Sequence, residues 1–446
     1  MVPLTRVRPD LRAVLHSRQA SARASAPGAV EDLVAAEGSS APSRRAAIAS
    51  GFFSSLAMFP TFRRLWLATL ASSVGQWMQS VALGWIALTM TNSPGFVGIV
   101  SFTAGLPFLI VSPMGGNLID RVDRRKLMLV CQALATVLAL AVAIDVIGGW
   151  VKPWHLVVAG FLNGSLQAML SPTQQSLVPN LVDRGSLTNA IGLMSAGQNM
   201  TRVIGPTLAG LVIGLVGEGE AFLLQAVAIA VAFVLVLSIQ LPPREAPTTR
   251  SRNPFEGLQI IFRREDLRGI FLLASIPTLL VFPYISFLNV IARDVLFIGA
   301  QGLGVLMAAS GFGAVLGALA VANQNRVEGV GRWLLGGTII YGLVIILLML
   351  SRNLWFSLPL LVIAGFLGSA FMVGNNAAIQ HRIQDSVRGR VMGAYMLTWG
   401  LMPLGALPMG ILGARIGVPH SVILFASVST VLTIILGATN QALRDL

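Results

Sequence analysis

From about residue 65 onward, the chain consists mainly of long apolar segments separated by short polar connections. Each segment is long enough to cross the roughly 30 Å hydrocarbon core of a bilayer as a helix. Inside that core every backbone amide must be hydrogen-bonded within the protein, so helices are expected. Twelve such segments are predicted: about 65–91, 96–119, 127–148, 154–177, 187–216, 221–240, 269–297, 302–324, 333–351, 355–380, 388–417 and 419–437.

The composition supports this fold class. Of the 446 residues, 55% are hydrophobic and 11% are charged, whereas soluble domains carry about 25% charged residues. The single cysteine, Cys131, excludes a disulfide framework and a thiolate metal site. The sequence therefore predicts an all-α integral membrane protein without a bound metal.

The basic residues follow membrane topology. The net charge of +13 would indicate a nucleic-acid partner in a soluble protein. With both termini placed in the cytoplasm, Lys152, Arg293, Arg352 and Arg415 lie near the outer face, Arg202 lies inside a segment, and the other basic residues are cytoplasmic. This asymmetry is typical of multi-pass proteins of the inner or plasma membrane. We therefore expect the lipid bilayer, and not nucleic acid, as the surroundings of this chain.

Two stretches without long apolar segments delimit the predicted domains. Residues 1–58 have the composition of a disordered cytoplasmic tail and contain no signal-peptide core. Residues 241–268 are rich in proline and arginine at their start, which predicts a cytoplasmic linker that ends in a short amphipathic helix. Six segments fall in 59–240, six in 269–437, and residues 438–446 form a second tail.

The two sets of six segments resemble each other at a nearly constant offset. The sequence T-F-R-R-L-W-L-A at 61 corresponds to D-L-R-G-I-F-L-L at 266, and G-F-L at 160 corresponds to G-F-L at 365, both at an offset of 205. Gly98 and Gly105 correspond to Gly304 and Gly311 at an offset of 206. The spacing predicts a duplication, with two six-helix halves as parallel repeats.

A dense charge cluster connects the second and third segments. Residues 116–126 read G-N-L-I-D-R-V-D-R-R-K, with four basic and two acidic residues. Such a cluster must lie in a loop at a membrane surface, because its burial in lipid would be costly. The pattern resembles the signature loop between helices 2 and 3 of the major facilitator superfamily of transporters.

This resemblance implies twelve helices in two halves and a gating role for the loop residues Gly116, Asp120, Arg121, Arg124 and Arg125. Asp120 would face the positive N-terminal end of helix 11 while the cytoplasmic side is closed. In the alternative interpretation the cluster only fixes the topology.

Residues 202–210 read R-V-I-G-P-T-L-A-G. Gly205, Pro206 and Gly210 give a small-residue face and a permitted bend, suited to close and mobile packing. The stretch resembles the antiporter motif of exporters in the superfamily, although ordinary helix packing would also explain it. Arg202 is the one charge well inside a segment, and it needs a partner, a polar cavity or an anionic ligand unless it reaches an interface.

Several polar or aromatic residues near the middle of segments are candidates for a substrate cavity, although packing between helices would also explain each one. Together with Arg202, these candidates are Gln76, Trp77, Gln79, Asn163, Gln167, Asn199, Tyr284, Asn289, Asn376, Tyr395 and Trp399.

Three stretches, 171–182, 205–210 and 388–395, resemble the branch of the superfamily that contains the bacterial enterobactin exporter and macrolide-efflux proteins. The resemblance covers about 59–437. It implies a monomeric inner-membrane exporter of small amphiphilic compounds, drug-like or siderophore-like, that works by alternating access without a cofactor. The family leads us to expect coupling to protons or another ion, but no carboxylate lies deep in the first six segments.

Other classes of protein find less support. Neither lysine, Lys126 or Lys152, lies in an ATP-binding P-loop, and neither H-E-x-x-H nor G-x-S-x-G occurs, so we do not expect an enzyme. A lipid-handling or non-transporting receptor-like member of the same fold remains the alternative.

We predict that Asp120→Asn leaves the protein inserted in the membrane but severely impairs transport, because the charge that holds the cytoplasmic gate is lost. The measurement is the transport rate at equal membrane abundance. A wild-type rate would contradict the gating role of Asp120.

Overall fold

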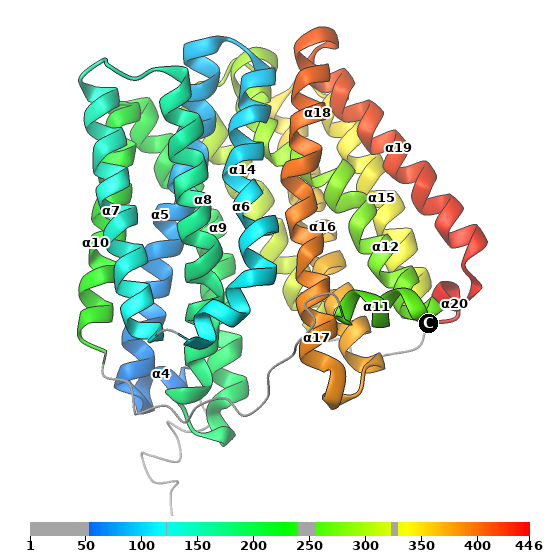
Figure 1. Cartoon of the computed structure of the whole chain (residues 1–446). Helices are drawn as coiled ribbons and strands as arrows, with labels where there is room; N and C mark the ends of the chain where they lie inside the picture. The colour runs from blue at the N-terminus through cyan, green and yellow to red at the C-terminus, as the bar shows by residue number, and fades with distance from the viewer. Residues whose placement is uncertain (1–52, 122, 240–255, 323–328) are drawn as a thin grey trace, which may run out of the picture. The chain divides into compact units, whose positions relative to one another are not determined.

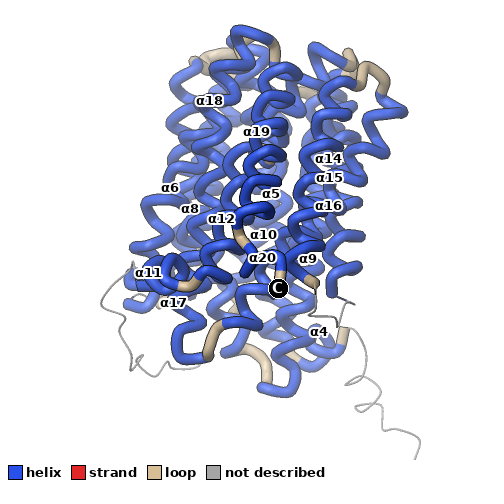
Figure 2. Tube along the Cα trace, turned by 90° about the vertical axis from the view of Figure 1, so that its right-hand side faces the viewer, coloured by secondary structure: helices blue, strands red, loops and turns tan. Residues whose placement is uncertain are grey.

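The computed structural model describes residues 53–121, 123–239, 256–322 and 329–446, with the side chains of 111–121, 322, 385 and 386 left out of the description. Every regular element in these ranges is helical (Figure 2). The chain divides after Met58, so the short helix α4, Ser54–Met58, is described by itself, and the rest concerns the unit that begins at Phe59.

The first half of this unit contains six long helices that run side by side (Figure 1). They are α5 Pro60–Thr91, α6 Pro94–Arg121, α7 Arg124–Ile147, α8 Pro153–Leu177, α9 Leu187–Leu215 and α10 Glu218–Leu237. Short 3₁₀ turns, η1 Val178–Asn180 and η2 Arg184–Ser186, connect α8 to α9.

The second half begins with the short helix α11, which precedes a broken segment. In order, its elements are α11 Glu256–Arg263, α12 Glu265–Leu280, η3 Phe282–Phe287, α13 Leu288–Val290, the π-helical turn η4 Ile291–Val295, α14 Gly299–Ala322, α15 Val330–Leu350, α16 Leu354–Arg382, α17 Asp385–Met396, η5 Leu397–Gly400, α18 Leu401–Ile416, α19 Val418–Thr439 and α20 Gln441–Arg444.

Eight helical segments in the described ranges are long and apolar enough to cross a membrane: α7, α10, the broken segment Glu265–Val295, α14, α15, α16, the segment Val387–Ile416 and α19. The helices α5, α8 and α9 have sufficient length, with 32, 25 and 29 residues. They are not among the eight segments that also meet the requirement for apolar character. By length and apolar character, the described ranges therefore contain eight of the twelve predicted spans.

Two predicted segments are not continuous α-helices. Between α12 and α14 the chain passes through a 3₁₀ turn that contains Pro283 and then the π-helical turn η4. The segment predicted at 388–417 begins at Asp385 and is interrupted by η5. Proline lacks the amide hydrogen that an α-helix needs, which accounts for the break at Pro283.

The short helix predicted at the end of the linker corresponds to α11. Ile261 is buried and Leu258 packs against the core, whereas Gln259 and Arg263 are exposed, so the helix has one apolar, buried side. It packs on α17, where a Cβ atom at Gly257 would collide with the carbonyl oxygen of Arg390. Arg390 also forms an ion pair with Glu256. α11 thus braces the start of the α17–α18 segment.

Two seams join the halves, α9 against α14 and α6 against α18. In the first seam a Cβ atom at Gly210 would lie 2.6 Å from the carbonyl oxygen of Ala300 and 2.8 Å from the Cα atom of Gly304. In the second, a Cβ atom at Gly98 would lie 2.8 Å from the carbonyl oxygen of Ala406. Only glycine permits backbones to approach this closely.

Candidate functional site

The charged loop binds helix ends within its own half. Arg124 donates from Nη1 to the carbonyl oxygen of Ser176 at 2.7 Å, and Arg125 donates from Nη2 to that of Leu237 at 2.6 Å. These carbonyls end α8 and α10, where a cation is favoured by the helix dipole. Asp123 caps α7 by accepting from the backbone amides of Arg125 and Lys126.

Of the other predicted gating residues in this loop, Gly116, Asp120 and Arg121 lie in α6, but their side chains fall outside the described residues. The contact between Asp120 and helix 11 stays a prediction.

The stretch that resembles the antiporter motif lies where α9 packs against α5 of its own half and against α14 of the other half. A Cβ atom at Gly205 would lie 2.5 Å from the Cβ atom of Trp77 on α5. Pro206 is buried, and its carbonyl oxygen lies beside Gly304 of α14. Gly205 therefore sets the packing within the first half, and Gly210 sets the packing against the second.

A polar clamp joins α5 to the segment that contains η4. Asn289 donates from Nδ2 to the carbonyl oxygen of Gly84 at 2.6 Å. Arg293 donates to the carbonyl oxygen of Leu88 at 3.0 Å and to Oδ1 of Asn92 at 2.6 Å. The bond from Asn289 to Gly84 and the bond from Arg293 to Leu88 each join residues that are 205 positions apart, the offset of the predicted repeat. We call this end of the helices the clamp end and the other, with Asp123 and Glu265, the loop end.

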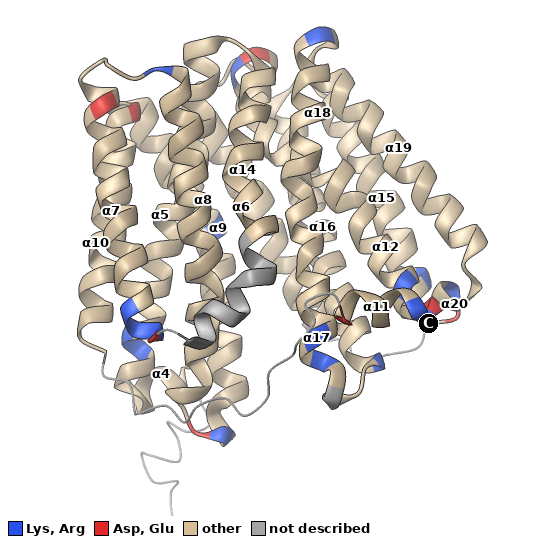
Figure 3. Cartoon of the chain, viewed as in Figure 1, with Lys and Arg blue, Asp and Glu red and all other residues tan. Residues whose placement is uncertain are grey.

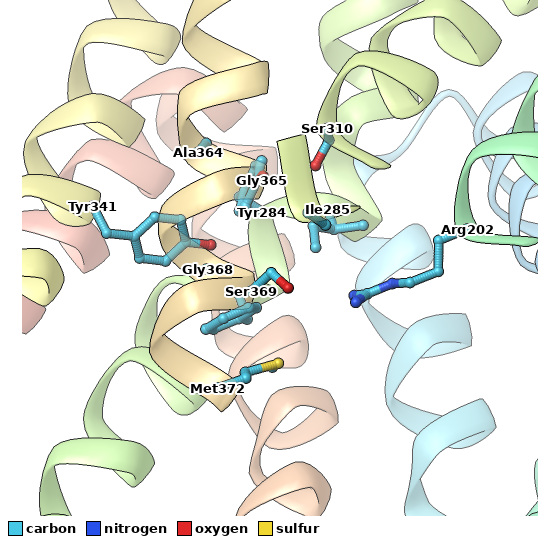
Figure 4. Close-up of a pocket in the computed structure, with 12 residues that line it drawn as sticks. Arg202, Tyr284, Ile285, Ser310, Tyr341, Ala364, Gly365, Gly368, Ser369 and Met372 are labelled. Atoms are coloured by element: carbon cyan, nitrogen blue, oxygen red, sulfur yellow. The ribbon is translucent and has the colours of Figure 1, made fainter. Parts of the chain in front are cut away.

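Arg202 lines a cavity between the halves, near the middle of α9. Its guanidinium group points from α9 toward Ser369 and Met372 of α16 (Figure 4). The cavity has a volume of about 20 Å³, which is room for roughly one water molecule. The Arg202 Cζ atom also lies 5.5 Å from the centre of the Trp77 ring, a cation–π distance.

The second half supplies the rest of the lining. Its polar members are the hydroxyl groups of Tyr284, Ser310, Tyr341 and Ser369. Ser310 and Tyr341 neighbour the Tyr284 hydroxyl. The apolar wall comes from Phe282, Ile285, Met372 and small residues of α14 and α16.

The structure brings three of the predicted cavity residues together: Arg202, Trp77 and Tyr284. Others serve elsewhere. Gln79 accepts from Gln225 of α10 at 2.9 Å, Asn289 belongs to the clamp, and the Asn199 side chain bonds within α9 to Ser195.

Asn376 accepts from Gln380 of its own helix. Tyr395 is buried and Trp399 is 44% exposed. Gln167 is buried, and Gln76 and Asn163 are half-buried. None of these lines the Arg202 cavity.

Sequence reasoning missed Tyr341, Ser310 and Ser369. A signal existed for Tyr341, because the chain has only three tyrosines and this one interrupts the strongly apolar α15. The two serines gave no such signal, since hydroxyl groups are common in membrane helices, where they bond to their own backbone.

Residues 51–445 match the transmembrane secretion effector family of the major facilitator superfamily. The chain belongs to this family. Its members are transporters and not enzymes, and the chain is accordingly a multi-pass membrane protein with a small-molecule substrate.

Two curated relatives align over most of their length. The staphyloferrin A transporter of Staphylococcus aureus is 23% identical over 376 residues, which is 83% of this chain and 94% of the relative. The multidrug efflux pump Tap of Mycobacterium tuberculosis is 26% identical over 400 residues, which is 85% and 93%.

Solved transporter structures share the fold. A bacterial homologue of the lysosomal transporter Spinster, solved in an inward-facing and unoccupied conformation, gives a TM-score of 0.65 at 17% identity over 86% of this chain and 96% of that chain. A POT family transporter in complex with 5-aminolevulinic acid gives 0.71 at 13% identity over 88% and 98%.

We predict that Gly210→Ala impairs transport, because its methyl group would force α9 away from α14. Overpacking of this kind typically costs about 1–3 kcal/mol. Gly192→Ala is the matched control, since it lies on the same helix and a Cβ atom there meets nothing within 4 Å. Equal transport by the two variants would mean that this seam does not have to close.

We also predict that Arg293→Gln opens the clamp end more often. The lost charged hydrogen bonds are worth about 1–2 kcal/mol in a partly exposed site, a factor of about 5–30 in population. Maleimide labelling of Ala292→Cys, which replaces a fully buried side chain, in a Cys131→Ser background should accelerate.

The control for Arg293→Gln is Arg415→Gln, which removes a charge from the exposed end of α18. Labelling of Ala292→Cys at an unchanged rate in Arg293→Gln would show that Arg293 does not hold this end closed.

Proposed function

We propose that this protein is a secondary active transporter that exports small amphiphilic compounds, drug-like or siderophore-like, by alternating access. The observation that carries this conclusion is the Arg202 cavity, which is lined by α9 of the first half and by η3, α14, α15 and α16 of the second, so that a ligand there would contact both halves. The names of the relatives, a siderophore transporter and a multidrug efflux pump, support the class of cargo. At 23–26% identity they do not specify the compound.

The proposed topology has twelve spans and both termini in the cytoplasm. In this scheme 1–58 is a tail, 59–240 and 269–437 are the six-helix halves, 241–268 is the linker, and 438–446 is a second tail. The two clamp bonds between residues 205 positions apart support a repeat in which corresponding residues meet near a common axis. The basic linker and loops would face the cytoplasm.

The described conformation would then be closed on the outside. Both seams and the clamp lie between the cavity and the clamp end, where Gly210 and Gly98 bring the helices together. Release of cargo requires these contacts to part while the loop end closes, and Asp120 is the proposed residue for that second gate. Gly205 and Pro206 would let α9 bend between the two states.

The energy source is proposed from the family alone, as a gradient of protons or another ion. The described acidic residues gather at the two ends of the helices (Figure 3). The chain is proposed to act as a monomer, without a cofactor and without nucleic acid.

Expression in an efflux-deficient host, followed by a susceptibility panel of amphiphilic compounds, tests this proposal. We expect protection against at least one compound, and counterflow of that compound, labelled, in proteoliposomes. An empty vector is the control. Protection against none, together with no counterflow of any panel compound, would favour the receptor-like or lipid-handling alternative.

A further inference from the structure

Arg202 is a half-buried cation in the interior, without a described counter-ion. The surrounding protein shields it in part from water, and the phenols of Tyr284 and Tyr341 line the same cavity. Among the residues that the structure describes, carboxylates lie at the two ends of the helices, away from the middle of α9 (Figure 3). A charge that is largely removed from water and has no partner is costly, so the fold retains Arg202 at some expense of stability.

The contact with Trp77 does not offset this cost. A cation over an aromatic ring at 5.5 Å gains about 0.5–2 kcal/mol. The penalty for an ion taken out of water is several kcal/mol even after relaxation of the protein. The Trp77 ring therefore orients the guanidinium without neutralising it.

The other polar groups of the cavity are hydroxyls: Ser369, and Tyr341 and Ser310, which hydrogen-bond to Tyr284 in this conformation and can redirect their protons to an oxyanion. The planar guanidinium of Arg202 can donate two parallel hydrogen bonds to a carboxylate. Phe282, Ile285 and Met372 add an apolar wall. This set fits a molecule with one anionic group and an apolar body.

We propose that the Arg202 cavity binds the oxyanion, a carboxylate or sulfonate, of an amphiphilic compound that the protein exports, an inference that rests on the proposed function. Arg202 comes from the first half and the hydroxyls come from the second. A bound anion therefore joins the halves at the point where they must move. Because the cavity holds about one water in this conformation, its lining side chains must rearrange to admit the rest of the ligand.

Binding of matched probes to the purified full chain in a neutral detergent tests the site. The probes are 4-phenylbutyrate, its neutral analogue 4-phenylbutyramide, and acetate. We expect the wild type to bind 4-phenylbutyrate at least about tenfold more tightly than the amide, and more tightly than acetate. Equal binding of 4-phenylbutyrate and 4-phenylbutyramide would overturn the proposal. If acetate bound as tightly as 4-phenylbutyrate, the site would be one for simple anions, and the proposal that the ligand is amphiphilic would be overturned.

Two arginine variants separate this role from a structural one. Arg202→Gln should abolish the preference for the anion, and Arg202→Lys should retain part of it. Arg415→Gln should behave as wild type. Without ligand, the unfolding temperature of Arg202→Gln should equal or exceed that of wild type, because a costly buried charge is gone. A lower unfolding temperature with the anion preference intact would assign Arg202 a structural role.

Tyr341→Phe removes one hydroxyl group and decides the question if Arg202→Gln does not fold. It should weaken 4-phenylbutyrate binding by about three- to tenfold and leave amide binding unchanged. An equal effect on both probes contradicts the proposal. Export is measured separately: anion binding without export would reject the proposed function alone, and export of neutral compounds by a fully active Arg202→Gln would reject the anion site alone.

Discussion

The free-energy cost of placing a charge in hydrocarbon determines where the charged residues of this chain lie. Nearly all described charges lie at the two ends of the helices, and where they enter the protein they bind helix termini, as Arg124 and Arg125 do at the ends of α8 and α10. Arg202 is the exception in the described interior. Since the same cost applies to it, its position between the halves needs a reason that folding does not supply, and an anionic ligand is that reason.

Close backbone contact sets where the halves touch. Gly210 with Gly304, and Gly98 with Gly410, allow helices from different halves to approach at their backbones. Such contacts gain only packing energy in a membrane, because lipid is as apolar as the side chains. They are therefore suited to parting and re-forming, whereas the polar bonds of Arg293 and Asn289 add direction and register at one end.

The sequence predicted the class of fold, an all-helical multi-pass membrane protein, because long apolar segments and a low content of charge are physical requirements of that class. It located α11, Arg202 and the glycines of α9. It could not show that Gln79 bonds to Gln225 or that Asn289 reaches Gly84, since a polar residue in an apolar helix is the same signal for a cavity and for a bond between helices. The π-helical turn at Arg293 was equally hidden, because no residue type there demands it.

The central claim is that the two ends of the protein open in alternation. Distances between spin labels, measured by pulsed electron paramagnetic resonance in a Cys131→Ser background, test it directly. One pair of labels is placed at Ser93 and Phe297 of the clamp end, and the other at Asn180 and Gly389 of the loop end. On addition of a compound shown to be exported, the first distance should lengthen while the second shortens. Transport with both distances unchanged, or with both changing in the same direction, would contradict alternating access about the Arg202 cavity.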